Sequence, residues 1–269
     1  MRIGAVNYLN SKPLVYGLEQ LAPSARVFYD LPSRLADSLV AGRLDVALIP
    51  SVEWFRGPDF KVVSDACVAC HGPVLSVKLH FRVPPEEVRR VALDEGSRTS
   101  AALTQILLTE LCNAHPQWEP LPIGYDATST QADAVLLIGD RAIQSIVGDF
   151  LEIWDLGERW LRWTGLPFVF ATWIARSGVD TSEVATILSA ARDNGMRHLA
   201  EIAMREAPLL GVPVDLTDRY LRQNLHFTLG RKERAGLARF HQLCVTHELV
   251  PRSNIHLFDD YFPNDCAAR

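Results

Sequence analysis

The sequence contains no apolar stretch long enough to cross a bilayer, and polar residues interrupt its first segment. Asn7, Asn10 and Lys12 break the apolar core that a signal peptide would need. An excess of one charge is also missing, because 27 basic residues face 32 acidic ones and the formal net charge is -5. The chain carries no basic patch or stripe of the kind that binds nucleic acid. These absences predict a cytoplasmic protein with neither a membrane nor a nucleic acid as its partner.

Cysteine is scarce and odd in number. Five cysteines in a reducing compartment predict free thiols. Cys67, Cys70 and His71 match the C-x-x-C-H pattern of covalent haem attachment, but they lie in the apolar run 62–77, which is typical of a buried strand. No second pair of Cys or His follows at the spacing of zinc ligands. We therefore expect buried strand cysteines, no metal ion and no organic cofactor.

Internal repeats, low-complexity tracts and an assignable His-Asp or Cys-His pair are missing as well. What is present is an alternation of short apolar strands with helices, the pattern of a mostly parallel α/β sheet. With 269 residues and 48% hydrophobic content, the chain can bury one large core or two modest ones. Strands are expected at 2–6, 26–29, 44–49, 61–67, 74–81, 91–93, 118–122, 135–138, 151–154 and 168–174. The main helices are expected at 14–21, 101–112, 182–207, 215–223 and 231–248.

Two breaks in this alternation indicate two lobes. Pro84-Pro85 ends the first series of strands, and the pattern becomes helical after 178. Residues 1–83 together with 177–269 are expected to form the first lobe, and residues 84–176 the second. Crossovers near Val83 and Arg176 would then act as hinges.

The segment VALDEGSRTSAALTQILL, at 91–108, has the layout of an anion-binding site. A short apolar strand ends, Gly96 permits a tight reversal, and Ser97, Thr99 and Ser100 offer caps for the following helix. Free N–H groups and the positive end of the helix dipole suit a carboxylate, and Arg98 could add a charge-assisted clamp. The alternative is that these hydroxyl groups only cap the helix.

Two further loops have similar chemistry. Asn10 and Ser11 follow the strand 2–6, and Ser51 follows the strand 44–49. In an open α/β sheet the loops that leave the carboxyl ends of strands form the ligand crevice, so the three loops predict one shared cleft. Asp140, after the strand 135–138, either faces the same cleft or caps a helix.

Several ordered segments resemble the chorismate dehydratase family of the futalosine route to menaquinone. They are RIGAVNYLNSKPLVYGL, LDVALIPSVEW, GPVLSV, VALDEGSRTSAALTQILL, ADAVLLIGDRA, GLPFVFATW and LHFTLGRKERAGLARF, and the resemblance runs from Arg2 to about Phe262. It implies a two-lobed, periplasmic-binding-protein-like (type II) α/β fold. Each lobe would be a mixed, mostly parallel sheet flanked by helices, with a ligand cleft between the domains. It also implies the conversion of chorismate to 3-[(1-carboxyvinyl)oxy]benzoate and water.

The same resemblance places Asn10 and Ser76 in the pocket as catalytic residues. An amide is too weakly basic to act as a conventional base, so we expect the proton to go to a carboxylate of the substrate. The candidates for substrate binding are Ser11, Ser51, Ser97, Arg98, Thr99, Ser100 and Asp140.

Two other functions remain open at the level of sequence. One is 1,4-dihydroxy-6-naphthoate synthase of the same pathway, although NYLNSKP stands where that enzyme usually starts with Ser-Pro-Cys-Pro-Asn-Asp. The other is a non-catalytic cytosolic protein that binds a small carboxylate, a reading based on fold analogy alone. Neither a monomer nor a homodimer is favoured by the sequence.

Overall fold

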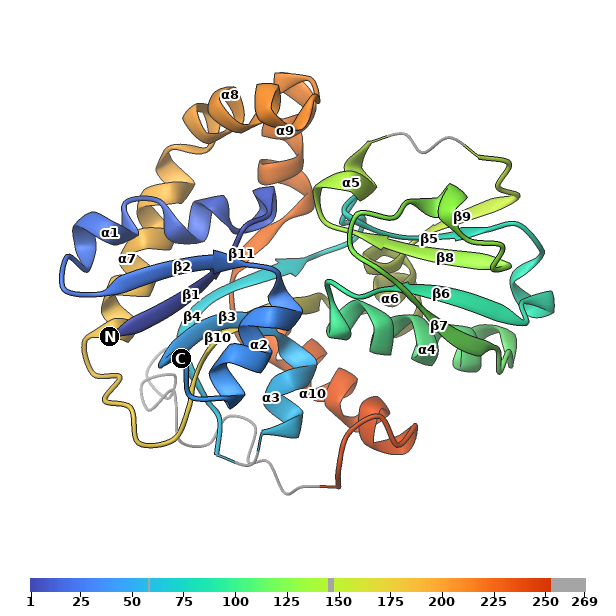
Figure 1. The fold of residues 1–269 in the computed structure, drawn as a ribbon, viewed down its shortest axis with the longest axis horizontal. Coiled ribbons are helices and arrows are strands. Elements are labelled where there is room, and N and C mark those ends of the chain that lie inside the picture. Colours follow the sequence, from blue (N-terminus) through green and yellow to red (C-terminus); the bar gives the residue numbers. More distant parts are fainter. Residues whose placement is uncertain (58, 145–147, 253–269) are drawn as a thin grey trace.

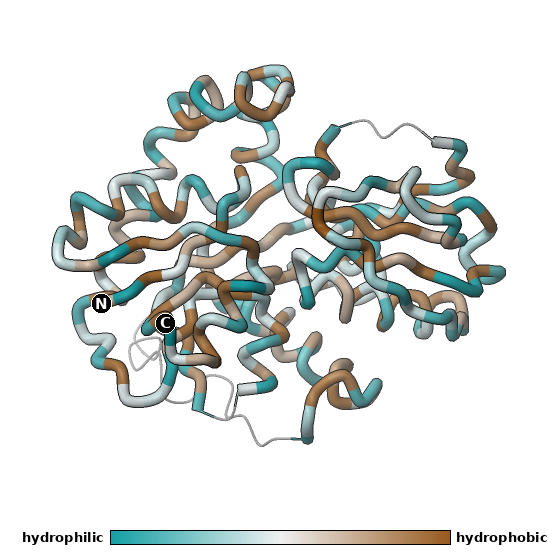
Figure 2. Tube along the Cα trace, in the orientation of Figure 1, coloured by the Kyte–Doolittle hydropathy of each residue, from teal (hydrophilic) through white to brown (hydrophobic). Residues whose placement is uncertain are grey.

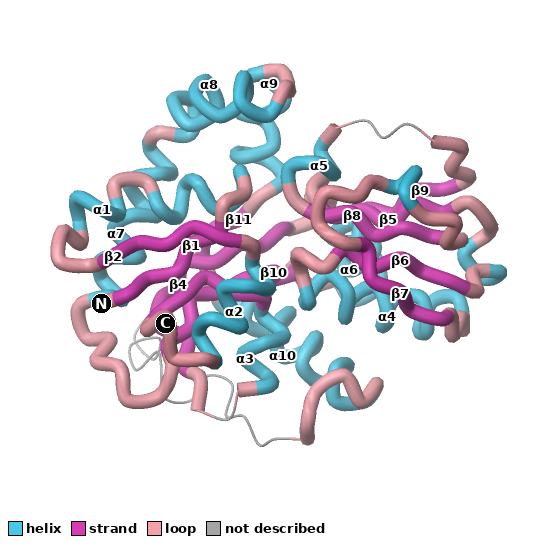
Figure 3. The backbone as a smooth tube through the Cα atoms, in the orientation of Figure 1, coloured by secondary structure: helices cyan, strands magenta, loops and turns pink. Residues whose placement is uncertain are grey.

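The protein is built from two α/β lobes, each around its own sheet (Figure 1). The computed structural model describes residues 1–57, 59–144 and 148–252. All ten predicted strands are present, with ends that differ from the predicted ones by a few residues. Figure 3 shows the strands of each lobe gathered together with helices packed around them. No helix in the described ranges has both the length and the apolar character needed to span a membrane.

The first sheet has six strands in the order β11-β4-β10-β3-β1-β2. Four of them, β2, β1, β3 and β4, run in one direction, and β10 and β11 run in the opposite direction. β11 was not predicted, because three residues are too short to show an alternation of apolar and polar side chains. The bounds are β1 Arg2–Val6, β2 Arg26–Asp30, β3 Val46–Pro50, β4 Lys61–Cys70, β10 Phe168–Ala175 and β11 His226–Thr228.

The second sheet has five strands in the order β7-β6-β8-β5-β9. β5 is antiparallel to both of its neighbours, and the other four strands share one direction. Two mixed sheets in which most strands share a direction confirm the predicted fold class. The bounds are β5 Val77–Phe81, β6 Arg90–Asp94, β7 Gln117–Leu121, β8 Ala134–Ile138 and β9 Glu152–Asp155.

The chain passes between the sheets at other places than the sequence predicts. β5 belongs to the second sheet, so the first crossover lies at 71–76 and not near Val83. β10 belongs to the first sheet, so the chain has already returned at 165–167, before Arg176. The predicted division at 83 and 177 therefore assigned one strand of each sheet to the wrong lobe. Proline and glycine mark local turns, whereas sheet membership depends on partners that are distant in sequence.

The helices lie near the predicted positions, but two of the predicted helices are each divided into two. The predicted helix 14–21 is a 3-10 helix, η1, and a short α1, separated by Gly17 at φ 73°. The predicted helix 182–207 is interrupted at His198, which lies between α7 and α8. The α-helices are α1 Leu18–Leu21, α2 Pro32–Val40, α3 Ser51–Arg56, α4 Arg98–Cys112, α5 Asp140–Ile143, α6 Leu156–Thr164, α7 Val184–Arg197, α8 Leu199–Leu210, α9 Val214–Arg219 and α10 Arg231–Thr246. Short 3-10 segments are η1 Leu9–Val15, η2 Pro85–Glu87 and η3 Ala127–Ser129, and a π-turn, η4, spans Tyr220–Asn224.

The core follows the central strands of both lobes. Every residue of β3, β8 and β10 is buried, and Figure 2 shows hydrophobic stretches along the strands of the second lobe. Cys67 and Cys70 are buried on β4 with free thiols, as predicted. One close approach fixes η1 in place, because a Cβ at Gly195 of α7 would lie 2.0 Å from the Pro13 carbonyl oxygen. Glycine at 195 therefore lets α7 hold the segment that carries Asn10.

Asp155 sets the shape of the first crossover. Its carboxylate caps α6 through the N–H groups of Gly157 and Glu158, and it also accepts hydrogen bonds from Val74 N at 2.9 Å and Leu75 N at 2.7 Å. These bonds support a tight turn in which Leu75 has a φ of 60°. A positive φ is costly for a leucine, so the surrounding bonds must compensate for it. The turn directs the next residue, Ser76, into the space between the lobes.

We expect Asp155→Ala to lower the free energy of unfolding by about 2–4 kcal/mol, as measured by urea denaturation. The helix loses its cap and two further N–H groups lose their acceptor. Asp126→Ala is the matched control, since Asp126 caps the exposed η3 helix and should cost much less. Equal losses in the two variants would contradict the role given to Asp155.

Candidate active site

The carboxyl ends of strands from both sheets enclose one pocket between the lobes. It encloses about 480 Å³ including its open mouth, and its wall is mostly apolar. Side chains that could form hydrogen bonds with a ligand come from η1, the first crossover and the start of α4. The lining residues are Val6, Tyr8, Asn10, Pro32, Pro50, Val68, Val74, Ser76, Val77, Ser97, Ser100, Ile138, Gly139, Phe170 and Ala171. The cleft predicted from three separate loops therefore exists as a single pocket.

Asn10 and Ser76 form the polar centre of this pocket, and Tyr220 contacts Ser76 from behind the pocket wall. Ser76 is 1% exposed, and its Oγ accepts a hydrogen bond of 2.8 Å from the hydroxyl of Tyr220. The amide of Asn10 approaches the same tyrosine closely enough to lower its pKa, in opposition to burial. Its Oδ1 is nevertheless buried without a partner among the described residues. A buried carbonyl oxygen without a partner is costly, so this atom is the natural place for a ligand to donate a hydrogen bond.

Tyr220 was missed at the level of sequence. It lies in the predicted helix 215–223, where nothing distinguishes it from a core aromatic residue, and it reaches the site through the π-turn η4. Complete burial raises the pKa of Tyr220 well above the ordinary value for tyrosine. The phenol therefore stays protonated at neutral pH and acts as a permanent hydrogen-bond donor.

Tyr8 forms one wall of the pocket, against two glycines of the second lobe. A Cβ at Gly139 would lie 3.0 Å from the Tyr8 ring, and Gly139 also has a φ of 69°. A Cβ at Gly96 would lie 2.9 Å from the Tyr8 hydroxyl oxygen. Gly96 lies in a turn, as predicted, but its φ is not positive, so glycine is required here by the close approach of Tyr8. Burial, and then the charge of Asp94, raise the pKa of Tyr8 well above its ordinary value.

Ser97 and Ser100 lie where the predicted anion-binding site was expected. Ser97 is the N-cap of α4, with its Oγ 3.3 Å from the backbone N of Ser100 and 3.0 Å from Ser100 Oγ. Both residues line the pocket. The first turn of a helix has N–H groups without intrahelical acceptors, and its dipole favours negative charge. The two readings of this segment are compatible, because one serine caps the helix and still faces the pocket.

Five other predicted substrate-binding residues are not among those that line the pocket, because each is engaged elsewhere: Ser11, Ser51, Arg98, Thr99 and Asp140. The buried hydroxyl of Ser11 donates to the backbone oxygens of Val6 and Tyr8. Ser51 Oγ donates to Val169 O at 2.8 Å and lies 3.3 Å from Thr99 Oγ1, which accepts from Val52 N. These hydroxyl groups hold backbone and join α3 of the first lobe to α4 of the second.

Arg98 is directed to the surface beside the cleft. Its guanidinium pairs with Asp37 at 2.7 Å and with Glu53 at 3.3 Å, both on helices of the first lobe. The sequence predicts that the positive charge of Arg98 binds a carboxylate of the substrate, but these two protein carboxylates pair with it instead. The arrangement differs from the predicted clamp, because Arg98 does not line the pocket and its partners are protein carboxylates.

Asp140 joins the lobes at the edge of the pocket. It begins α5, and its carboxylate accepts a hydrogen bond of 2.9 Å from Leu9 N of η1. Burial raises the pKa of Asp140 to about 6, and the Leu9 N–H and Lys12 oppose this rise. Lys12 is itself paired with Glu206 at 3.6 Å. Asp140 is therefore neither the N-cap of α5 nor a residue of the pocket wall. It forms a hydrogen bond to the opposite lobe instead.

Two lobes that close over a shared polar cleft define a protein of the periplasmic-binding-protein-like fold. The structure is similar to the periplasmic aliphatic sulphonate binding protein of Escherichia coli, with a TM-score of 0.58 and 16% identity over 94% of this chain and 88% of that one. At this level of identity the similarity concerns the fold alone.

The chain belongs to the menaquinone biosynthesis family, whose sequence profile matches residues 1–246. It is 33% identical over 256 residues to the chorismate dehydratase of Thermus thermophilus, covering 88% of this chain and 93% of that protein. It is 27% identical over 257 residues to the chorismate dehydratase of Campylobacter jejuni, covering 93% and 100%. The family resemblance expected from the sequence motifs is therefore confirmed.

We expect Asp140→Asn to gain stability relative to the unchanged protein as the pH rises from 4 to 7. A carboxyl whose folded pKa is about 6 binds its proton more tightly when folded, so its ionisation weakens the folded state between about 4 and 6. The difference in the free energy of unfolding should grow by about 2–3 kcal/mol, measured by urea denaturation at each pH.

Asp45→Asn is the control for this pH series. Arg2 holds the pKa of Asp45 well below its usual range, so its effect changes with pH only below about 4, and in the opposite direction. A pH-independent difference for Asp140→Asn would contradict the buried position of its carboxyl.

Proposed function

We propose that this protein is a chorismate dehydratase, a carbon-oxygen lyase that converts chorismate to 3-[(1-carboxyvinyl)oxy]benzoate and water, and that it acts in the cytoplasm. The observation that carries the proposal is the buried, unpartnered Oδ1 of Asn10 beside the hydroxyl of Ser76 in the pocket between the lobes. The chorismate dehydratases of two bacteria, to which the chain is similar over most of its length, support the choice of substrate.

The pocket suits a small dianion that carries an apolar ring. Its lining includes no Lys and no Arg, so the carboxylates would bind to neutral donors: the hydroxyls of Ser97 and Ser100 and the first N–H groups of α4. Phe170 and the valines of the wall would contact the ring. Neutral donors in a site from which water is excluded hold charge more strongly than they do in water.

The lining contains no side chain that could act as an ordinary base. It includes no Asp, Glu or His, and its one titratable group, Tyr8, has a pKa raised well above the ordinary value. A raised pKa keeps Tyr8 protonated, so it cannot accept the ring proton at neutral pH. This supports a reaction in which a carboxylate of the substrate takes that proton, as the weak basicity of Asn10 also suggests. The protein would then contribute position and electrostatics.

The polar centre suits the departing hydroxyl group. Because Tyr220 donates to Ser76 Oγ, the proton of Ser76 is free to point toward the oxygen of the substrate hydroxyl. Asn10 Oδ1 would accept the hydrogen of that same hydroxyl. When the ring C–H bond breaks, its electrons form the new ring double bond, and the C–O bond breaks with its electrons staying on oxygen. The oxygen leaves as water after taking up one proton, so the aromatic product differs from chorismate by one H₂O.

We expect Asn10→Ala to lower the rate of chorismate loss by at least about 100-fold, the effect of removing one well-placed polar group. The assay mixes purified protein with chorismate and follows loss of one water by chromatography and mass. Asn7→Ala is the matched control, because Asn7 is an exposed amide in the same loop that accepts only a 3.3 Å bond from Lys12. Asn10→Asp should also be inactive, since it places a negative charge beside the substrate.

The other possible results of this assay would contradict the proposed reaction or favour a different function. Full activity in Asn10→Asp would overturn proton transfer to the substrate. Unchanged chorismate with a rise in melting temperature would indicate a silent carboxylate-binding protein. Unchanged chorismate with no rise would favour a different substrate, such as that of 1,4-dihydroxy-6-naphthoate synthase.

A comparison of two buried serines separates substrate binding from stability. We expect Ser100→Ala to raise KM for chorismate about 10-fold, because a donor to a carboxylate is lost. Ser51→Ala should leave KM within about twofold and lower the free energy of unfolding by about 1–2 kcal/mol, because its hydroxyl holds backbone. Steady-state kinetics and urea denaturation of both variants give the answer, and a KM effect in Ser51→Ala would contradict the assignment.

A further inference from the structure

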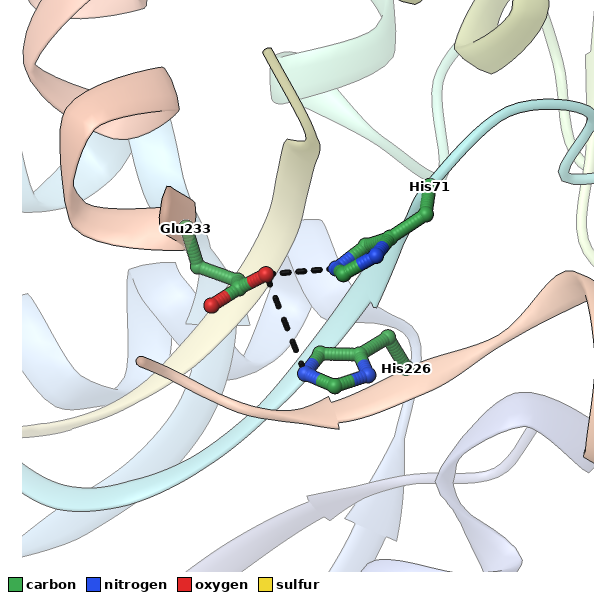
Figure 4. A group of neighbouring side chains, drawn as sticks. All are labelled: His71, His226 and Glu233. Atoms are coloured by element: carbon green, nitrogen blue, oxygen red, sulfur yellow. Dashed lines mark hydrogen bonds and ion pairs between the residues drawn. The ribbon is translucent and has the colours of Figure 1, made fainter. Parts of the chain in front are cut away.

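Three potential metal ligands meet outside the pocket, where the chain leaves the first lobe. His71 follows the last residue of β4, His226 begins β11, and Glu233 lies in the first turn of α10. Figure 4 shows both imidazole rings directed toward the carboxylate. None of the three residues lines the pocket around Asn10. The proposed reaction makes no use of them.

The distances are close to those of a metal site. His71 Nε2 lies 2.5 Å from Glu233 Oε1, His226 Nε2 lies 3.8 Å from the same oxygen, and one ligand atom from each residue lies within 4.8 Å of the others. With zinc–ligand bonds of about 2.0–2.1 Å, tetrahedral ligand atoms are about 3.3 Å apart. The two observed distances lie on either side of 3.3 Å, and side-chain movements of about 1 Å would bring both ligand pairs to that separation. The two rings, with centroids 4.3 Å apart and an interplanar angle of 35°, already lie on the same side of the carboxylate.

The burial of the carboxylate and the exposure of the two imidazoles suit the binding of a cation. Glu233 has a side chain that is only 5% exposed, whereas His71 is 48% and His226 38% exposed. A buried carboxylate with two imidazoles at its accessible side leaves the opposite side of the cluster open to solvent, where water would complete a tetrahedron. Burial, together with the neighbouring His71, lowers the pKa of His226. Arg192 also faces His226, and its charge is balanced by Asp65 at 3.0 Å and Asp193 at 2.7 Å.

We propose that His71, His226 and Glu233 bind one divalent transition-metal ion of the zinc class. Two imidazoles and one carboxylate are a common ligand set for such an ion. The ion would tie the end of β4, at the first crossover, to β11 and α10 of the first lobe. The sequence offered no sign of it, because His71 and Glu233 are 162 positions apart and the ligand spacing of a metal motif is local. The site would add a metal ion to a protein for which the sequence predicts none, and it is independent of the reaction proposed above.

The test measures metal binding by the full chain without a polyhistidine tag, after treatment with a chelator and dialysis. Zn²⁺ is titrated by calorimetry, and Co²⁺ is titrated while its visible absorption is recorded, since intense bands report tetrahedral coordination. We expect one ion per chain, and a loss of affinity of at least about 10-fold in each of His71→Ala, His226→Ala and Glu233→Gln. Zn²⁺ should also raise the melting temperature of the unchanged protein, and this rise should disappear in the three variants.

His247→Ala is the matched control. His247 Nε2 lies 2.7 Å from Glu110 Oε1 on the surface, and this pair belongs to no group of three potential ligands in the described part of the chain. The control should bind Zn²⁺ like the unchanged protein. Circular dichroism confirms that each variant is folded.

Three results would overturn the site: no binding by the unchanged protein, affinity retained in all three alanine and glutamine variants, or equal loss in His247→Ala.

Discussion

The paired strands β4 and β10 are the constraint on which the rest of the structure depends. The chain leaves the first lobe at the end of β4 and returns at the start of β10, and the two strands are hydrogen-bonded to each other with Cys70 opposite Phe168. The inserted second lobe is therefore attached through two adjacent segments. This attachment places the carboxyl ends of β1 and β3 opposite those of β6 and β8, so that loops from both sheets share one pocket.

Small polar contacts then hold the lobes together around that pocket. The carboxylate of Asp140 binds the backbone of η1, Ser51 meets Thr99, and Arg98 pairs with Glu53. Each such contact contributes only about 1 kcal/mol net, which is a suitable strength for a cleft that must open to admit a ligand. The hydroxyl-rich segments that the sequence singles out thus divide into two groups. One group faces the pocket, and the other fixes the lobes around it.

The pocket combines an apolar wall with donors that carry no charge. Tyr220 and Tyr8 are both held protonated by burial, and the polar atoms at the centre are amide and hydroxyl groups. Such a site can orient an anion and polarise a leaving hydroxyl, but it has no strong base of its own. Charged groups lie outside it instead, in the ion pairs of Arg98 and Lys12 and in the cluster of His71, His226 and Glu233.

Ten of the eleven described strands, the fold class and the loops that form the cleft follow from local patterns in the sequence. Apolar runs such as 135–138 are recognised as strands from their own residues alone. Asn10, Ser76, Ser97 and Ser100 lie in motifs that stand out along the chain. Three features become visible only in the folded chain: which hydroxyls face the pocket, where the chain crosses between lobes, and that Tyr220 supports Ser76. The physical reason is that side-chain direction and sheet membership depend on partners far away in sequence. Ser51 and Thr99 are 48 positions apart, and their hydroxyls form hydrogen bonds with backbone groups and with each other. No local pattern distinguishes these two residues from the serines that face the pocket.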